Sequence, residues 1–461
     1  MSLNPRIPQP GFLQHIHEPP KRYLKEWLDV PAHIHHMAYR MANPPTERPQ
    51  SREEFRHLLQ CLTIPDEDCV VHEKLGYGVK TAENGDRLVV AWEAHTEYYS
   101  YQIWHLPADR EKPLEFGAIG FPGYYFPFSP LGIRINALDM IICPVEQMAQ
   151  EQLKGLLPGP QLYGSQVFGQ TIHVATTFTP DGDIRERYYI WAPTRDVLLQ
   201  HLLRLTDTLV AIENYTHLIL LPFQAFGRAV DHVHEYEQRH LYQRSVIMNQ
   251  LETATPQALQ HWLTVLSKDF LAVSRMAESM RYKLSAAPPY QSIVLSNLTA
   301  LQERPLPFTR PIGDYVSGMI TGVVEGYQQL LRRIDALEHD FEGTIAVIRT
   351  KVELLLQAQN LAIEQQNLKM LASVDKTTKS QAILQHTVEG LSVIVIAYYL
   401  SGLANYIVKA LHKGGWLANA EFASALVVPC ALVVSCALIY FGRKVINKRL
   451  LSEKGASEET K

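Results

Sequence analysis

The chain has 461 residues, a formal net charge of −4 and a sequence pI near 6.6. This length can hold two soluble domains besides a membrane segment. The slightly acidic balance argues against nucleic acid as the main partner, because proteins that bind nucleic acid usually present a strongly basic surface. The five cysteines show no paired spacing, which is typical of reduced thiols in a cytosolic protein.

The first part of the chain predicts an α+β domain at residues 21–193, after a proline-rich, flexible N-terminus at residues 1–20. A helix is expected to begin at Ser51, because Ser51 and Glu54 fit a capping box. Alternating apolar residues and the turn signal Asn84-Gly85 then predict a mostly antiparallel sheet. The expected strands are residues 32–40, 69–80, 134–143, 167–178 and 184–191, and residues 87–104 are expected as a long strand or a bent pair. A further helix is expected at residues 144–156.

Residues 194–388 predict a helical stalk, because strand signals nearly vanish there. Helices are expected at residues 194–214, 226–251 and 256–286, and a much longer one begins at Asp314. We expect Pro288-Pro289 to interrupt the helical pattern. Apolar steps of three and four along the long helix predict a bundle or coiled-coil seam. The seam residues are Val323, Leu330, Ile334, Leu337, Phe341, Ile345, Ile348, Val352 and Leu355.

Two apolar segments near the C-terminus predict a transmembrane hairpin at residues 389–442. Gly390–Leu411 and Phe422–Gly442 are each about 20 residues long and carry no charge at their centres, which suffices to cross a bilayer as helices. The short connection between them requires an antiparallel arrangement. The alternative is a buried helical hairpin of a soluble protein, a rare arrangement for two such segments in tandem.

Basic residues on both sides of the hairpin set its expected orientation. Lys369, Lys376 and Lys379 precede the first span, and further basic residues open the tail at residues 443–461. The positive-inside rule therefore places both termini in the cytoplasm. On this interpretation the lipid bilayer is one partner of the chain, and the tail is cytosolic, first basic and then polar.

Four segments make the chain resemble a bacterial family. They are Trp92–Tyr98, Gly164–Gly169, Arg281–Ala286 and, most specifically, His386–Ser392. The family is known as a domain of unknown function and is described as a predicted membrane-anchored protein. The resemblance implies a protein of the bacterial inner membrane and brings no activity with it. The chain departs from the family at Leu28–Pro31, where the family usually has His-Ala-Arg-Pro.

The layout is also similar to that of the CorA-type magnesium transporters, as an analogy of arrangement only. Those proteins combine a cytosolic α/β domain, a long helix that enters the membrane, and two spans joined by a short outer loop. They end the first span with Gly-Met-Asn, whereas this chain has Gly402-Leu403-Ala404-Asn405 at the matching place. The analogy implies an oligomeric cation channel or transporter.

Polar residues of the first span recur at helical steps and predict a single stripe. They are Tyr398, Ser401, Gly402, Asn405 and Lys409, with Glu389 at the inner end. The stripe could line a pore formed by several copies, with Asn405 contacting hydrated ions. It could instead join helices, because Gly402 permits close approach and Asn405 can hydrogen-bond across an interface. The helix-joining interpretation is the commoner one, and both interpretations predict a homo-oligomer.

A second candidate site lies on the long strand predicted at residues 87–104. Glu93, His95 and Glu97 are expected to alternate onto one face together with Tyr99 and Tyr101. A carboxylate–histidine–carboxylate row can hold a divalent cation, take part in acid–base chemistry, or bind a cytosolic protein partner. The ordinary alternative is a satisfied polar network without a ligand.

Histidines also gather early in the chain. His15, His17, His33, His35 and His36 lie there, and His33 and His35 are expected to share a strand face, which suits a metal, although no fixed third or fourth ligand stands near them. Nucleophile elbows and phosphate-binding loops are missing, so neither a catalytic residue nor an enzyme activity is expected, and a divalent cation is the only cofactor considered. Two functions remain: a CorA-like ion channel, or a non-conducting membrane-tethered scaffold or sensor.

Overall fold

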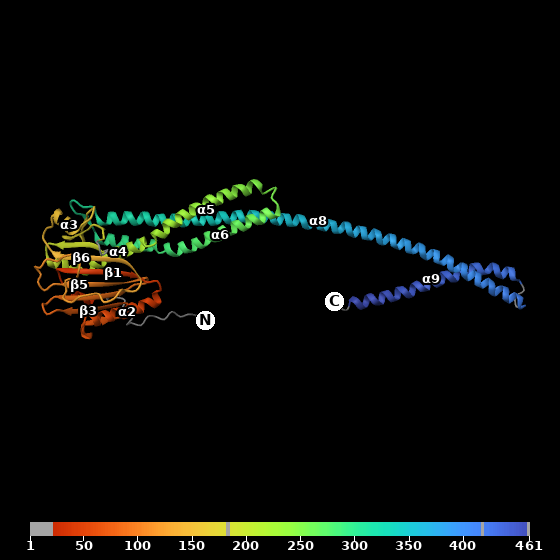
Figure 1. Cartoon of the computed structure of the whole chain (residues 1–461), viewed down its shortest axis with the longest axis horizontal. Coiled ribbons are helices and arrows are strands. Elements are labelled where there is room, and N and C mark those ends of the chain that lie inside the picture. Colours follow the sequence, from red (N-terminus) through yellow and green to blue (C-terminus); the bar gives the residue numbers. More distant parts are fainter. Residues whose placement is uncertain (1–21, 181–184, 416–418, 459–461) are drawn as a thin grey trace. The chain divides into compact units, whose positions relative to one another are not determined.

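The computed structural model describes residues 22–180, 185–415 and 419–458 (Figure 1). The predicted N-terminal segment, with His15 and His17, lies outside these residues. The chain divides into two compact units, Met1–Ile348 and Arg349–Lys461. Each unit is described by itself, and helix α8 (Ile312–Lys413) contributes residues to both.

The first unit contains a mixed sheet in the order β10-β7-β8-β9-β6-β1-β5-β4-β3-β2. Neighbouring strands are antiparallel except β6 and β9, which are parallel, so the expectation of a mostly antiparallel sheet is confirmed. The strands are β1 (Ala32–Arg40), β2 (Cys69–Val71), β3 (Leu75–Thr81), β4 (Arg87–Ala94), β5 (Tyr98–Leu106), β6 (Ile133–Pro144), β7 (Tyr163–Val167), β8 (Ile172–Thr176), β9 (Glu186–Ala192) and β10 (Arg304–Pro305).

The single strand expected at residues 69–80 is in fact a hairpin, and of the two arrangements expected at residues 87–104 the structure has the pair. Residues 69–80 form β2 and β3, which pair with each other, and residues 87–104 lie in β4 and β5, which pair across a tight turn at His95–Glu97. The His95 amide donates to the Tyr98 carbonyl at 2.8 Å and closes this turn. The sequence signal was ambiguous because apolar and aromatic residues continue through the turn, so their alternation does not mark it.

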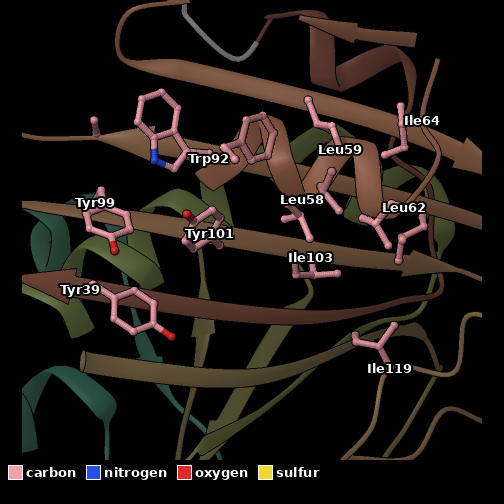
Figure 2. Packing of buried hydrophobic residues seen from close by; sticks show 14 of the residues in the cluster. Tyr39, Leu58, Leu59, Leu62, Ile64, Trp92, Tyr99, Tyr101, Ile103 and Ile119 are labelled. Carbon is pink, nitrogen blue, oxygen red and sulfur yellow. The ribbon is translucent and has the colours of Figure 1, made fainter. Parts of the chain in front are cut away.

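One face of the sheet is covered by helix α2 (Pro44–Cys61) and by the loop between β5 and β6. Figure 2 shows Leu58 and Leu59 of α2, and Leu62 just after its end, beside sheet residues that include Tyr101 and Ile103. The helix comes close because β3 carries glycine there: a Cβ at Gly76 would lie 2.5 Å from the Phe55 ring. Glycine is therefore a packing requirement at this position.

Helix α2 begins at Pro44, earlier than the expected start at Ser51. Proline is tolerated in the first helical turn, where its missing amide has no intrahelical partner. The Glu47 carboxylate accepts hydrogen bonds from the amides of Ala42, at 2.9 Å, and Asn43, at 3.2 Å, and thereby caps the helix. The Ser51 hydroxyl donates to the Arg48 carbonyl inside the helix, so Ser51 is no cap.

The opposite face of the sheet is covered by helix α4 (Arg195–Leu220), which packs on β6 and β9. Helix α7 (Ala287–Leu301) packs in turn against α4. The expected interruption is present at Ser285–Ala286, just before Pro288-Pro289, and the two prolines themselves lie in the first turn of α7. A short helix, α3 (Gln150–Leu156), packs over the β9 side of the first face.

Helices α5 (Phe223–Gln250), α6 (Pro256–Leu284) and the first part of α8 pack together. Contacts across them include a hydrogen bond of 3.1 Å between His240 and Thr344, and ion pairs Arg333–Glu237 at 2.7 Å and Arg281–Glu338 at 2.6 Å. The buried stripe of α8 is Val316, Ile320, Val324, Tyr327, Leu330, Ile334, Leu337, Phe341, Ile345 and Ile348.

Most of the predicted seam is therefore buried within one chain, and its register departs from the expected one only at Val323, where the neighbouring Val324 is buried instead. Beyond Ile348 the stripe is no longer buried within one chain: Val352 is half-buried and Leu355 is exposed. A coiled coil in this part of the chain stays a prediction.

The second unit contains the rest of α8 and helix α9 (Ala420–Glu458), and it holds segments that are long and apolar enough to cross a membrane. One such segment lies within Ile312–Lys413 and the other is Ser424–Gly442, and little of either is buried. Trp416, in the connection between them, lies outside the described residues.

Candidate functional site

The central strand β1 places polar side chains on both faces of the sheet. Its neighbours are β5 and β6, and the register sets His35 opposite Asp139 on β6 and His33 opposite His105 on β5. Because side chains alternate along a strand, His33 and His35 share the face covered by α2 and the β5–β6 loop, whereas His36 faces α4. Strand β1 thus contributes to two buried polar clusters.

The first cluster, which we call the His–Asp cluster, consists of His33, His35 and Asp139. Their exposed fractions are 2%, 4% and 0%. His33 Nε2 lies 2.7 Å from Asp139 Oδ1, and His35 Nε2 lies 3.8 Å from the same oxygen. The other carboxylate oxygen, Oδ2, accepts a hydrogen bond of 2.7 Å from the Gly117 amide. The shared face expected for His33 and His35 is therefore present, and Asp139 is the further group the sequence did not reveal.

Arg185, just before β9, is the cation beside this cluster. Its Nη1 lies 3.4 Å from His35 Nε2 and donates to the Gly117 carbonyl at 3.4 Å. Burial is the main reason that the pKa of His35 is lowered to about 4; Asp139 opposes the shift, and the positive charge of Arg185 and the nearby His33 add to it. The His35 ring is therefore neutral at pH 7, and the guanidinium faces an unprotonated ring nitrogen.

The second cluster, which we call the Glu–His cluster, lies on the opposite face between β9 and α4. It consists of Glu186, Tyr188, Glu213 and His217. The Tyr188 hydroxyl donates to Glu213 Oε1, and His217 Nε2 lies 3.5 Å from Glu186 Oε1. His217 Nδ1 lies 2.9 Å from the Glu213 carbonyl oxygen, one helical turn back. The groups therefore form one continuous hydrogen-bonded network.

Protonation of the Glu–His cluster differs from that of the free side chains. Burial and, after it, the nearby Glu186 carboxylate raise the pKa of Glu213 to about 8, against the opposing effects of His217 and Tyr188. Burial opposes protonation of His217, but its hydrogen bond to Glu186 and the charges of both carboxylates outweigh that effect and raise the pKa to about 9. At pH 7 Glu213 is therefore mostly neutral and His217 is positive, so each of the two groups holds its own proton.

The row expected at Glu93, His95 and Glu97 is not on one strand face. Strand β4 ends at Ala94, so the turn changes the alternation: Trp92 lies opposite Tyr101, and Glu93 lies opposite Ser100. Glu93 thus has the opposite orientation to Tyr99 and Tyr101.

The turn still brings two of these side chains together and sets the third apart. His95 stacks on Tyr98 with ring centroids 4.2 Å apart, and its Nε2 lies 3.8 Å from Glu93 Oε1. Glu97 instead accepts a hydrogen bond from Tyr290 of α7. The shared-face interpretation is wrong, and a cation or partner at these residues stays a prediction.

The stripe expected on the first span is divided between two environments. Ser401 and Asn405 are half-buried, whereas Tyr398, Gly402 and Lys409 are exposed. Ser401, Gly402 and Asn405 line one groove together with Val428 and Leu432 of α9. Ala397, Ala431 and Ser435 are buried, which fits the close approach of two helices through small residues. Glu389 is half-buried, with Oε2 3.7 Å from His386 Nδ1.

Comparison with protein-family models shows to which family the chain belongs. The model of the family "Protein of unknown function (DUF3422)" matches residues 17–446. The chain belongs to the DUF3422 family. Comparisons with curated proteins and with solved structures give no match. The family thus accounts for both units of this DUF3422 protein and leaves its function to be inferred from the sites.

The segment in which this DUF3422 protein departs from the expected His-Ala-Arg-Pro forms an ion-pair centre. Asp29 accepts hydrogen bonds from Arg195, at 2.7 and 2.9 Å, and from Arg110, at 2.9 Å. Burial alone would raise the pKa of Asp29, but hydrogen bonds from Arg195 and the Val30 amide outweigh it and lower the pKa. A structural ion pair therefore stands where the resemblance implied a histidine and an arginine.

Proposed function

We propose that this DUF3422 protein is a non-conducting scaffold or sensor anchored in the bacterial inner membrane by residues 389–442, with both termini in the cytoplasm. The observation that carries the proposal is the exposure of apolar side chains along both candidate spans, for example Leu403 at 66% and Val433 at 67%. Soluble proteins rarely expose apolar surface of this extent, whereas a bilayer covers it favourably. The cytosolic sheet domain would bind the partner or ligand.

The alternative is an oligomeric cation channel of the CorA type. A channel would need the polar stripe of the first span to face a central axis formed by several copies. Ser401 and Asn405 instead line a groove shared with α9 of the same chain, and Lys409 adds a positive charge near the expected outer mouth. These positions favour helix joining over conduction.

The test of the anchor is fractionation followed by ion flux. We expect the full chain to stay with membranes after alkaline carbonate extraction, and a chain without residues 389–442 to enter the soluble fraction. In liposomes the full chain should pass Mg²⁺ and Co²⁺ no faster than empty liposomes do. Soluble full-length protein would overturn the anchor, whereas flux abolished by Asn405→Leu would replace the scaffold by the channel.

A substitution at Gly402 tests self-association through the first span. A Cβ at Gly402 would meet no other atom within 4 Å, so Gly402→Leu should leave the fold of one chain unchanged. If copies meet at this face, the larger side chain blocks their close approach, and we expect the oligomer seen in mild detergent to shift to monomer. Size-exclusion chromatography with light scattering measures the change.

The matched control is Gly442→Leu, because a Cβ at Gly442 also meets nothing within 4 Å. Gly442 is the last residue of the second candidate span, Ser424–Gly442, and its substitution should leave the oligomer unchanged. An unsubstituted chain that is already monomeric would contradict the predicted homo-oligomer.

A further inference from the structure

We propose that His33, His35 and Asp139 form a binding site for one divalent transition-metal ion such as Zn²⁺ or Fe²⁺. Two imidazoles and one carboxylate are a ligand set that zinc and non-haem iron both accept. The inference concerns the sheet domain alone and does not rest on the membrane anchor.

The geometry of the three ligand atoms is close to that of a metal site. The potential ligand atoms of the three residues lie within 4.8 Å of one another. Ligand bonds of about 2.0–2.2 Å place neighbouring donor atoms about 2.8–3.6 Å apart in octahedral or tetrahedral coordination. The observed separations from Asp139 Oδ1, 2.7 Å to His33 and 3.8 Å to His35, fall on either side of that range. Small rotations of the side chains would therefore suffice.

The ligands are also well supported by the fold. His33 and His35 stand on one face of β1 and Asp139 stands directly opposite His35 on β6, so the backbone of a central sheet fixes all three. The Gly117 amide holds Asp139 Oδ2 and leaves Oδ1 toward the histidines. Outer hydrogen bonds of this kind orient the ligands of metal sites.

Arg185 gives the proposal its sharpest test. Its guanidinium lies 3.4 Å from His35 Nε2, the nitrogen that would bind the metal. An arginine cannot lose its proton in this environment and competes with a metal ion for the same lone pair. If the cluster is a purely structural network, Arg185 stabilises it, and removing the guanidinium should not improve metal binding. If the cluster is a metal site, removing the guanidinium should strengthen metal binding.

Among the residues that the structure describes, the Glu–His cluster is the other group of ligands close enough for a metal, and the structure favours it less. Glu186, Glu213 and His217 also lie within 4.8 Å of one another. Tyr188 already donates to Glu213, and His217 compensates the charge of Glu186, so a proton satisfies this cluster. Its variants therefore serve as controls.

The experiment uses the full chain in detergent after treatment with a chelator. Co²⁺ is titrated and followed by its visible absorption, and Zn²⁺ binding is then measured by competition. We expect one metal ion per chain, and we expect His35→Gln and Asp139→Asn to weaken binding at least about 10-fold, the loss typical even of residues outside the coordination shell. Arg185→Ala should tighten binding. His36→Gln, on the opposite face of the same strand, and Glu213→Gln should bind as the native chain does.

Near-ultraviolet circular dichroism confirms that each variant is folded, and His33→Gln replaces any variant that is not. A native chain that binds neither Co²⁺ nor Zn²⁺ would overturn the proposal. Binding that survives both His35→Gln and Asp139→Asn, or that is lost in Glu213→Gln alone, would place the metal elsewhere and overturn it as well. Weaker binding in Arg185→Ala would show that this cluster is a structural network.

Discussion

Above pH 6.5 the stability of the protein should fall as the pH rises to about 9, because the native Glu–His cluster binds protons that the unfolded chain releases. Folding raises the pKa of Glu213 to about 8 and that of His217 to about 9, both above their ordinary values of 4.5 and 6.5. Stability decreases with pH wherever the native state binds more protons than the unfolded state. The contribution of His217 is complete below pH 6.5 and is lost as the pH passes 9. At 1.36 kcal/mol per pKa unit it amounts to about 3 kcal/mol.

Thermal unfolding of the full chain in detergent at a series of pH values measures this effect. His217→Gln should flatten the curve above pH 6.5, since glutamine can accept no proton there. The matched control is His232→Gln, an exposed histidine of α5, which should leave the curve unchanged. A native unfolding temperature that rises steadily between pH 6 and 9 would contradict the protonation assigned to this cluster.

Phe55→Ala should lower the free energy of unfolding by about 3–5 kcal/mol, the range typical of phenylalanine truncation in a well-packed core. Phe55 is fully buried on α2 and stacks over Trp92 with ring centroids 6.1 Å apart. The ring also occupies the space above Gly76, so its loss leaves a cavity between α2 and the sheet. Denaturant unfolding measures the change, and Phe223→Ala, at a residue that is 50% exposed, is the control.

A double-mutant cycle makes this prediction specific to the close approach of α2 and β3. Gly76→Ala alone should be destabilising, because its Cβ would meet the Phe55 ring at 2.5 Å. In the Phe55→Ala background the same change should cost less, since the ring is gone. Additive effects of the two substitutions would mean that the helix moves away from the sheet rather than packing against it.

Local sequence patterns determined most of the helices and strands of this protein. Arg195–Leu220, Phe223–Gln250 and Pro256–Leu284 lie close to the expected ranges, because helical apolar periodicity is a property of a short window of residues. The two apolar segments near the C-terminus are likewise set by composition and length alone. The motifs that suggested the family lie in both units and led to the family that the comparison established.

Tertiary structure alone decided which polar side chains meet. Asp139 stands 106 residues after His33, and only the pairing of β1 with β6 brings the two together. Because of the tight turn at His95–Glu97, Tyr99 and Tyr101 lie on the face opposite to Glu93. A turn that the sequence does not mark changes the face of every side chain that follows it. Glu186 and Glu213 share a site because α4 packs back on β9. Side-chain proximity at such distances depends on strand register and helix packing, which no local window of the sequence contains.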